Sequence, residues 1–288
     1  MNIVNNDVNF GSLGSLIGIT GIIATLFKEL GIIQFVDSLI PKERKHKVTH
    51  GEYFLALLLV SFSLESRALY SVSEQLRKLP LQLLFGRDIS YLDFNDDVLG
   101  KFLEAIFNFG TKAFFWRFTS HIQQQLPDLY DMSKLHGDTT NFGVHGKYEQ
   151  EPEAPFKITY GHPKDGRNRL KLFTLFLLTD ANGIPLLMKE LSGNASDSKE
   201  LGSNMIQAMD KLKQNIDFEK EPYCIADAAF YNKNNIQNFN GLFISRVPET
   251  IKEANNLVAS EIEMTQVEDQ EGYRFYTTSS SYGDVEQK

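Results

Sequence analysis

One stretch of sequence decides the fold class, and it reads Leu170-Lys171-Leu172-Phe173-Thr174-Leu175-Phe176-Leu177-Leu178-Thr179-Asp180-Ala181-Asn182-Gly183. Its first nine residues are mostly apolar and of types that favour strands, and the Asp-Ala-Asn-Gly at its end is typical of a turn. The segment Ile184–Leu191 continues the apolar character after that turn. We therefore predict a β-hairpin with Leu170–Leu178 as its first strand and Ile184–Leu191 as its second.

Strand and helix signals alternate on both sides of this hairpin. Before it, Lys134–His136 is predicted to be a short strand that runs into Asp138. After it, the apolar spacing predicts a helix at Ser196–Asn215, a strand at Tyr223–Ala226 that ends in Asp227, a helix at Asn232–Phe239 and a strand at Leu242–Val247. This order predicts a mixed α/β sheet with Asp138 and Asp227 at strand ends.

Residues 1–128 carry helical signals instead. Apolar residues recur at close to helical spacing in Ile19–Leu30, and Gly31 is a stop signal. Helix starts are indicated by two capping-box patterns and one N-cap residue, namely Thr49 with Glu52, Ser71 with Glu74, and Asn95. The character of the sequence changes at about Asp128–Ser133. We therefore predict a helical N-terminal domain at 1–128 and an α/β domain at 129–288.

Composition and charge narrow the class of protein. The 288 residues are 42% hydrophobic and 23% charged, which is ordinary for a globular protein. The net charge of −8 excludes nucleic-acid binding through overall basic charge, although it leaves a local basic surface open. Cys224 is the single cysteine, so an internal disulfide is excluded and a reducing, intracellular compartment is expected. The uncharged Val8–Phe27 and the short apolar Tyr53–Leu64 are expected to be core helices and not membrane spans.

Two segments combine a strand with an acid and small residues directly after it, and they read His136-Gly137-Asp138-Thr139-Thr140 and Ile225-Ala226-Asp227-Ala228-Ala229-Phe230. If the two strands are neighbours, the carboxylates of Asp138 and Asp227 converge at one edge of the sheet. Two such hard oxygen ligands suit Mg²⁺ or Mn²⁺, which keep open positions for phosphate oxygens and water. The alternative is that each aspartate is a turn residue or an N-cap after a strand.

The clearest basic patch lies in Lys157–Lys171, and its cations are Lys157, Lys164, Arg167, Arg169 and Lys171. Cations on a loop beside a carboxylate site suit a phosphate backbone, and the alternative is a solvated loop. Other chemistries lack their motifs, because the chain has no phosphate-binding Gly-x-x-x-x-Gly-Lys-Ser/Thr loop, no Gly-x-Ser-x-Gly and no zinc-ligand spacing. Cys224 lies within an apolar strand and is expected to pack rather than to react.

Seven segments carry a family resemblance, and they are Lys134-Leu135-His136-Gly137-Asp138-Thr139-Thr140, Tyr160-Gly161-His162-Pro163-Lys164-Asp165-Gly166-Arg167, Leu191-Ser192-Gly193-Asn194-Ala195-Ser196-Asp197, Ala226-Asp227-Ala228-Ala229-Phe230-Tyr231, Leu30-Gly31-Ile32-Ile33, His50-Gly51-Glu52 and Asn95-Asp96-Asp97-Val98-Leu99-Gly100. The first four, in this order, resemble one branch of the DDE-type insertion-sequence transposases, and the last three, from the helical half, resemble the N-terminal domain of unknown function in that branch. The resemblance implies an α/β fold with a helical N-terminal domain, followed by an incomplete ribonuclease-H-like mixed sheet with flanking helices.

The resemblance also implies roles for individual positions. Asp138 and Asp227 match the first two catalytic acids, which hold Mg²⁺ or Mn²⁺ for a two-metal attack on DNA phosphodiesters in DNA transposition. From the basic patch, the residues expected to bind DNA are Lys164, Arg167, Arg169 and Lys171. The implied partners are DNA at the element ends and a second chain, either as a homodimer or as a full-length transposase copy, with no membrane. The implied location is cytoplasmic and associated with the nucleoid.

The family's third acid is a Glu in the pattern Tyr-x-x-Arg-x-x-x-Glu-x-x-x-x-x-x-Lys. Arg274 follows Tyr273 directly, which is the wrong spacing, and no Glu follows in register. The resemblance therefore predicts a catalytic domain at 129–288 that is truncated before the third acid, and a product that is inactive or nearly so. Two other functions stay open. One is a non-catalytic DNA-binding or interaction remnant that inhibits a full-length copy, and the other is an unrelated metal-dependent phosphohydrolase that uses Asp138 and Asp227.

Overall fold

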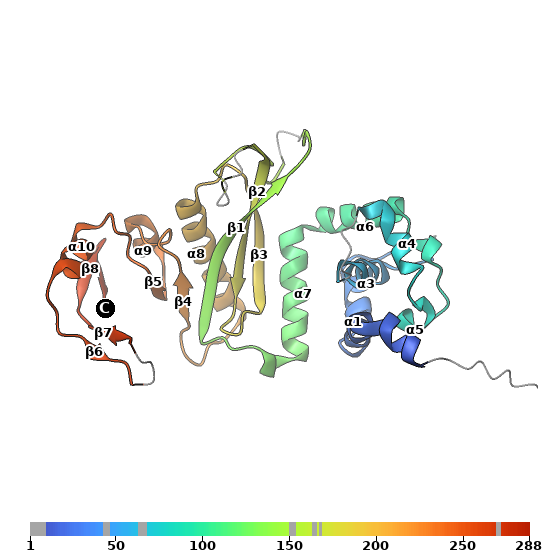
Figure 1. The fold of residues 1–288 in the computed structure, drawn as a ribbon, viewed down its shortest axis with the longest axis horizontal. Coiled ribbons are helices and arrows are strands. Elements are labelled where there is room, and N and C mark those ends of the chain that lie inside the picture. Colours follow the sequence, from blue (N-terminus) through green and yellow to red (C-terminus); the bar gives the residue numbers. More distant parts are fainter. Residues whose placement is uncertain are drawn as a thin grey trace, which may run out of the picture. The chain divides into compact units, whose positions relative to one another are not determined.

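The computed structural model of the chain describes residues 10–42, 47–62, 68–149, 154–162, 166, 169–268 and 272–288. The chain forms two compact units, Met1–Gln125 and Leu126–Lys288. The first unit is helical, and the second holds a mixed sheet with flanking helices (Figure 1). The structure is therefore mixed α/β with a helical N-terminal region, as the sequence predicted.

The helical unit consists of α1 (Phe10–Glu29), α2 (Ile32–Leu39), α3 (His50–Ser61), the 3-10 helix η1 (Leu69–Ser71), α4 (Val72–Leu76), α5 (Leu81–Phe85), the 3-10 helix η2 (Tyr91–Phe94), α6 (Asp96–Phe109) and α7 (Thr111–Gln125). Their apolar faces meet in one core, in which Leu55, Phe94 and Phe102 are fully buried. Gly31, with φ 61°, separates α1 from α2 in a left-handed conformation that glycine adopts at little cost.

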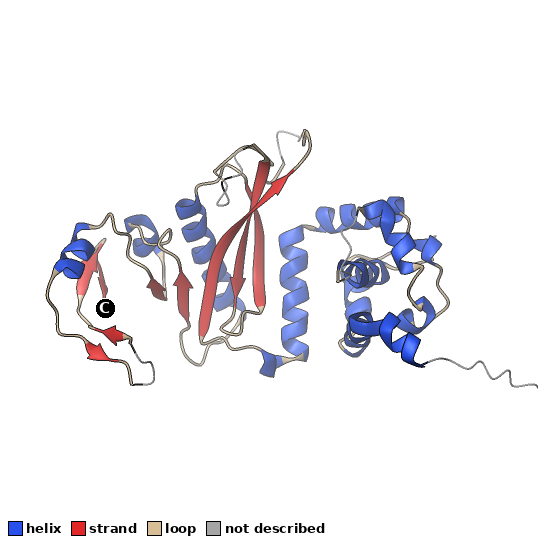
Figure 2. Cartoon of the chain, viewed as in Figure 1, coloured by secondary structure: helices blue, strands red, loops and turns tan. Residues whose placement is uncertain are grey.

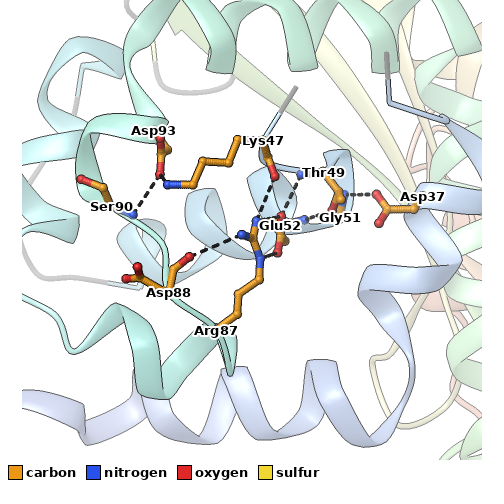
Figure 3. A network of polar contacts seen from close by, with 9 residues as sticks. All are labelled: Asp37, Lys47, Thr49, Gly51, Glu52, Arg87, Asp88, Ser90 and Asp93. Atoms are coloured by element: carbon orange, nitrogen blue, oxygen red, sulfur yellow. Dashed lines mark hydrogen bonds and ion pairs between the residues drawn. The ribbon is translucent and has the colours of Figure 1, made fainter. Parts of the chain in front are cut away.

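The first turn of α3 is the polar centre of this unit (Figure 3). The predicted capping box is confirmed, because the Glu52 N–H donates to Thr49 Oγ1 at 3.3 Å and the Thr49 N–H donates to Glu52 Oε2 at 2.8 Å. Arg87 donates to both oxygens of the same carboxylate, at 2.6 and 2.8 Å. The Gly51 N–H donates to the Asp37 carboxylate of α2 at 2.8 Å. Since Glu52 is only 6% exposed, these contacts fix where α3 begins inside the unit.

The other two predicted helix starts differ in outcome. Asn95 caps α6, because its Oδ1 accepts the Val98 N–H at 3.1 Å. The capping box predicted at Ser71 is wrong, since its side chain makes no cap bond and its hydroxyl donates to the Ala68 carbonyl at 2.8 Å. The physical reason is backbone conformation: Ser71 ends η1 with φ −90° and ψ −6°, whereas an N-cap side chain needs an extended residue.

Among the residues that the structure describes, no single helix is long and apolar enough to cross a membrane. Gly18–Glu29 and Ile32–Leu39 pass that test only as a pair, and the pair is bent by 63° at the break between them. Phe27 of the first helix and Val36 of the second are buried in the core of the helical unit.

The second unit consists of the 3-10 helix η3 (Pro127–Leu129), β1 (Lys134–Val144), β2 (Lys171–Thr179), β3 (Pro185–Ser192), α8 (Asp197–Asn215), β4 (Tyr223–Ala226), α9 (Lys233–Asn238), β5 (Leu242–Ser245), α10 (Lys252–Ala259), β6 (Thr265–Gln266), β7 (Arg274–Phe275), β8 (Ser280–Tyr282) and β9 (Val285–Gln287). Five strands form one sheet in the order β3-β2-β1-β4-β5 (Figure 2). The β3-β2 and β2-β1 pairs are antiparallel, and the β1-β4 and β4-β5 pairs are parallel. The predicted hairpin is confirmed as β2 and β3.

Strand β1 is longer than predicted, and this changes the position of Asp138. The sequence predicted a strand at Lys134–His136 with Asp138 at its end, but β1 continues to Val144 because β2 pairs with it as far as Lys171 opposite Val144. Strand β4 pairs with β1 only as far as Ala226 opposite Gly137. Asp138 therefore lies inside β1, at the level where its parallel neighbour β4 ends, and β1 and β2 continue beyond that level (Figure 1).

The two faces of the sheet differ in cover. On one face β1 packs against α8 so closely that a Cβ on Gly137 would lie 2.0 Å from the Met205 sulfur. The opposite face, next to the β5 edge, carries large apolar side chains that are about half exposed: Tyr223 at 46%, Leu242 at 41% and Ile244 at 51%. Tyr223 is the register partner of Leu242, so these side chains share one face.

Two of the segments quoted above meet through glycines. A Cβ on Gly161 would lie 1.9 Å from the Gly193 carbonyl oxygen, and a Cβ on Gly193 would lie 1.9 Å from the Leu172 carbonyl oxygen. This approach lets Thr159 and Leu172 exchange N–H···O bonds of 3.1 and 2.9 Å. The segment around Thr159 therefore pairs with the first residues of β2, beyond the point where β3 ends.

Candidate metal and nucleic-acid site

Asp138 and Asp227 lie side by side at one level of the sheet. The last register partners of β1 and β4 are Gly137 and Ala226, and each aspartate is the next residue of its chain. Because neighbouring strands lie about 4.8 Å apart, the main chain at the two aspartates is expected to be separated by about that distance. Gly137 faces α8, so the alternation of side chains along a strand directs both aspartates to the opposite face. Both side chains are exposed there.

A main-chain N–H nearby in sequence holds each carboxylate. The Thr139 N–H donates to Asp138 Oδ1 at 2.7 Å, and the Ala229 N–H donates to Asp227 Oδ1 at 3.0 Å. The second contact is an Asx turn, so the alternative interpretation of an aspartate that makes a turn after a strand describes the local bonding of Asp227. It does not describe Asp138, which lies within β1.

The donor set of this pair fits a hard divalent cation. Two exposed carboxylates on rigid elements are the protein ligands that Mg²⁺ takes where substrate phosphates and water fill its remaining positions. Within the described ranges, no group of three or more His, Cys, Asp or Glu side chains could hold a metal ion. The described residues therefore offer two adjacent carboxylates and not a complete protein cage for a metal.

The two residues predicted to bind DNA that the structure describes, Arg169 and Lys171, lie along the sheet from the acidic pair and not beside it. Arg169 is exposed in the turn before β2, and Lys171 is the first residue of that strand. Since Lys171 is opposite Val144 and Leu177 is opposite Asp138, six residues of β2 separate Lys171 from the level of Asp138, or about 20 Å. Leu177 is opposite Asp138 and therefore shares its face of the sheet. Lys171 is an even number of residues from Leu177 along β2, so its side chain lies on that face too. Its ammonium group donates to the Lys147 carbonyl. Lys164 and Arg167 lie outside the described residues.

Sequence reasoning passed over Arg246, which stands at the same level as the two aspartates. It follows β5 directly, and Ser245 before it is the register partner of Ala226 before Asp227. The predicted strand Leu242–Val247 contained Arg246, whereas β5 ends at Ser245, so Arg246 follows its strand in the structure as Asp227 follows β4. Arg246 is exposed.

Cys224 packs in the interior, as predicted. It is 2% exposed, and its Sγ lies 3.8 Å from the Met209 sulfur on α8. Burial raises the pKa of this thiol to about 12, so the group is protonated at neutral pH. Since the thiolate is the nucleophilic form of cysteine, this buried thiol is not expected to act as a nucleophile.

Part of the chain matches a known family model, and the chain is weakly similar to a solved structure. A family model described as a domain of unknown function, DUF4277, matches residues 14–120, which all lie in the helical unit. A search of the curated proteins finds no match to the chain. Among solved structures, the chain is similar to "Mos1 transposase paired-end complex with left transposon end", with 10% identity and a TM-score of 0.26 over 72% of this chain. The chain spans 62% of the length of that structure. That TM-score is too low to assign a fold.

Proposed function

We propose that this chain is a transposase-related protein of the DDE insertion-sequence type, whose second unit is a ribonuclease-H-like domain of the kind that acts on DNA phosphodiesters. The observation that carries the proposal is the register that sets Asp138 beside Asp227 at the end of β4. The sequence segments that resemble this family include both aspartates. The family model that matches the helical unit agrees with the domain of unknown function in that resemblance.

The topology of the sheet supports the ribonuclease-H-like part of the proposal. Three strands in antiparallel pairing are followed in the chain by two that pair in parallel with β1 and with each other. Helix α8 connects β3 to β4, and α9 connects β4 to β5. Such a mixed sheet with flanking helices is what the sequence resemblance implies. In this sheet, the residue after β4, Asp227, lies on the face opposite α8.

In this proposal Asp138 and Asp227 hold Mg²⁺ or Mn²⁺. When bound, the cation would polarise a phosphodiester and lower the pKa of the attacking water or hydroxyl. The N–H groups of Thr139 and Ala229 hold one oxygen of each carboxylate, so the ligands are already oriented before the cation binds. Because the side chains are already oriented, less side-chain conformational entropy is lost when the cation binds.

The DNA backbone is proposed to run along the open face toward the distal end of β1 and β2. There Arg169 and Lys171 would contact phosphates. Lys164 and Arg167, which precede them in the sequence, are proposed to bind DNA as well. The interval of about 20 Å between Lys171 and the acidic pair corresponds to about six nucleotides of one strand. A second copy of the chain, or a full-length transposase, would hold the other element end.

The test is metal binding by the full chain, followed by cleavage of a labelled duplex in Mn²⁺. We expect the unchanged protein to bind Mn²⁺ in titration calorimetry, and Asp138→Asn and Asp227→Asn each to lose that binding and any cleavage. Asp210→Asn is the matched control, because Asp210 is exposed on α8, which covers the other face. Mn²⁺ binding that persists in both site variants would overturn the proposal.

One observation favours a second candidate, a DNA-binding protein without catalytic activity. The described part of the chain offers the cation only two adjacent carboxylates and no third ligand. Such a protein would bind element ends, leave the labelled duplex intact in Mn²⁺, and lower cleavage by an added full-length transposase. Cleavage by the purified chain that is lost in Asp138→Asn would exclude this candidate.

A further inference from the structure

A positively charged residue completes the row formed by Asp138 and Asp227. Strands β4 and β5 are parallel, with Ala226 opposite Ser245, so Asp227 and Arg246 occupy equivalent positions one residue later. The two segments are still hydrogen-bonded just beyond the ends of the strands, because the Ser245 hydroxyl donates to the Asp227 carbonyl at 2.8 Å. Across β1, β4 and β5 the row therefore reads Asp138, Asp227, Arg246.

The three side chains share the open face of the sheet. Ile225 and Ile244 are register partners two residues before Asp227 and Arg246, and side chains two apart along a strand point to the same face. Ile244 is 51% exposed, whereas Cys224 and Ala226, at the alternate positions of β4, are buried. The row therefore lies opposite the face that α8 covers.

The guanidinium of Arg246 is not committed to the protein. Across the described ranges, no carboxylate lies within ion-pairing distance of it, and no hydrogen bond links it to another group. The neighbouring Asp227 carboxylate instead accepts the Ala229 N–H. Arg87 in the helical unit shows the contrasting case, because its guanidinium donates to both oxygens of Glu52. An arginine that neutralised Asp227 would be expected to pair in the same way.

We propose that Arg246 binds a phosphate of the DNA backbone next to the Asp138–Asp227 pair, an inference that rests on the proposed function. Two carboxylates repel a phosphodiester, so a fixed cation at the same level lowers the cost of bringing one close. The guanidinium matches two phosphate oxygens at once, which fixes orientation as well as position. With Arg246 on the β5 side and Lys171 about 20 Å along β2, the bound strand would cross the open face obliquely over the carboxylates.

The experiment measures binding of a short fluorescein-labelled DNA duplex to the full chain by fluorescence anisotropy, in KCl between about 50 and 200 mM. Arg246→Gln is expected to weaken binding and to reduce the slope of log K against log salt by about 1, because one phosphate contact is lost. Arg246→Lys should keep the slope, since the charge remains. Arg274→Gln is the matched control, because Arg274 is also exposed but lies on the β6–β7 hairpin, and its slope should equal that of the unchanged protein.

The outcomes distinguish failure of the Arg246 inference from failure of the proposed function. A reduced slope in Arg246→Gln alone supports the inference. If the unchanged protein binds the duplex and Arg246→Gln binds with the same slope, the inference is wrong and the proposed function stands. If the unchanged protein does not bind the duplex at any salt concentration, the proposed function and the inference both fall. Thermal melting of each variant shows that a change in slope does not come from unfolding, because Arg246 is exposed and its replacement should leave the melting temperature unchanged.

Discussion

At the scale of single residues, the segments of the helical unit that resemble a transposase branch have structural roles, because their residues pack or cap helices. In His50-Gly51-Glu52, the His50 ring nitrogen Nδ1 hydrogen-bonds the Ile40 carbonyl at 2.7 Å. Gly51 lets α3 approach α2, and Glu52 forms the capping box and the pair with Arg87. Asn95 caps α6. The described contacts of these residues serve the fold of the unit, whereas the residues proposed for chemistry lie in the second unit.

Gly51 gives the sharpest prediction for packing. A Cβ at this position would lie 2.3 Å from the Ile33 carbonyl oxygen and 2.7 Å from its Cα, and main-chain atoms cannot move aside as a side chain can. We expect Gly51→Ala to destabilise the helical unit by about 1–3 kcal/mol or more in denaturant unfolding. Gly100→Ala is the control within α6, because no atom lies within 4 Å of its added Cβ, and it should stabilise by about 0.5–1 kcal/mol. Equal effects of the two substitutions would contradict the close approach of α2 and α3.

Glu52 gives a pH-dependent prediction. Burial alone would raise the pKa of this carboxyl, but the hydrogen bonds from Arg87 and from the Thr49 N–H outweigh it, so the pKa lies below its ordinary value of 4.5. A carboxyl with a lowered pKa in the folded state adds stability above that ordinary value and loses it as the pH falls through the folded value. We expect Glu52→Gln to lower the free energy of unfolding by about 1–3 kcal/mol at pH 7, and the difference from the unchanged protein to shrink below about pH 4.5.

The comparison for Glu52 is an exposed ion pair in the same unit. Glu74 and Arg77 lie 3.3 Å apart, and their side chains are 63% and 62% exposed. Such pairs contribute about 0–1 kcal/mol, so Glu74→Gln should leave stability nearly unchanged at every pH. A penalty for Glu52→Gln that is no larger than this, or that persists unchanged at pH 3, would show that the buried pair is not what stabilises the start of α3.

At the scale of elements, the edge strand β5 exposes apolar side chains that favour aggregation. Its residues Leu242 and Ile244 are 41% and 51% exposed on the open face, beside Tyr223 of β4. An exposed apolar edge strand is a site of association between chains. We expect the double variant Leu242→Thr and Ile244→Thr to aggregate less on mild heating, as measured by light scattering, because threonine favours strands and is polar. Unchanged scattering at the same melting temperature would mean that another surface drives association.

The sequence predicted the elements of the sheet well because their signals are local. Apolar strands bounded by turn residues located β2, β3 and β4 to within a residue or so. The C-terminal end of β1 could not be predicted from such local signals. After Thr140 the chain carries Asn141 and Gly143, which favour turns, and only pairing with β2 keeps that part extended to Val144. The position of Asp138 inside a strand is therefore a tertiary effect.

The candidate site was predictable in part for the same reason. A charged residue after an apolar strand is visible in sequence, and this pattern identified Asp138 and Asp227. Which strands are neighbours is set by the topology, so the spacing of the two aspartates and the position of Arg246 in the same row required the structure. The pairing of the Thr159 segment with Leu172, which Gly161 and Gly193 allow, depends on residues more than ten positions apart and has no local signal.

At the scale of the whole molecule, each unit buries apolar residues of its own, such as Leu55 and Phe94 in the first and Leu172 and Met205 in the second, so we expect unfolding in two steps. The single tryptophan, Trp116, lies on α7, and its fluorescence reports the first unit, whereas far-UV circular dichroism reports both. Gly51→Ala should shift the fluorescence transition. Gly193→Ala, whose Cβ would lie 1.9 Å from the Leu172 carbonyl oxygen, should leave that transition in place and shift only the remaining dichroism step. Coincident transitions by both probes, moved together by either substitution, would show that the units unfold as one cooperative body.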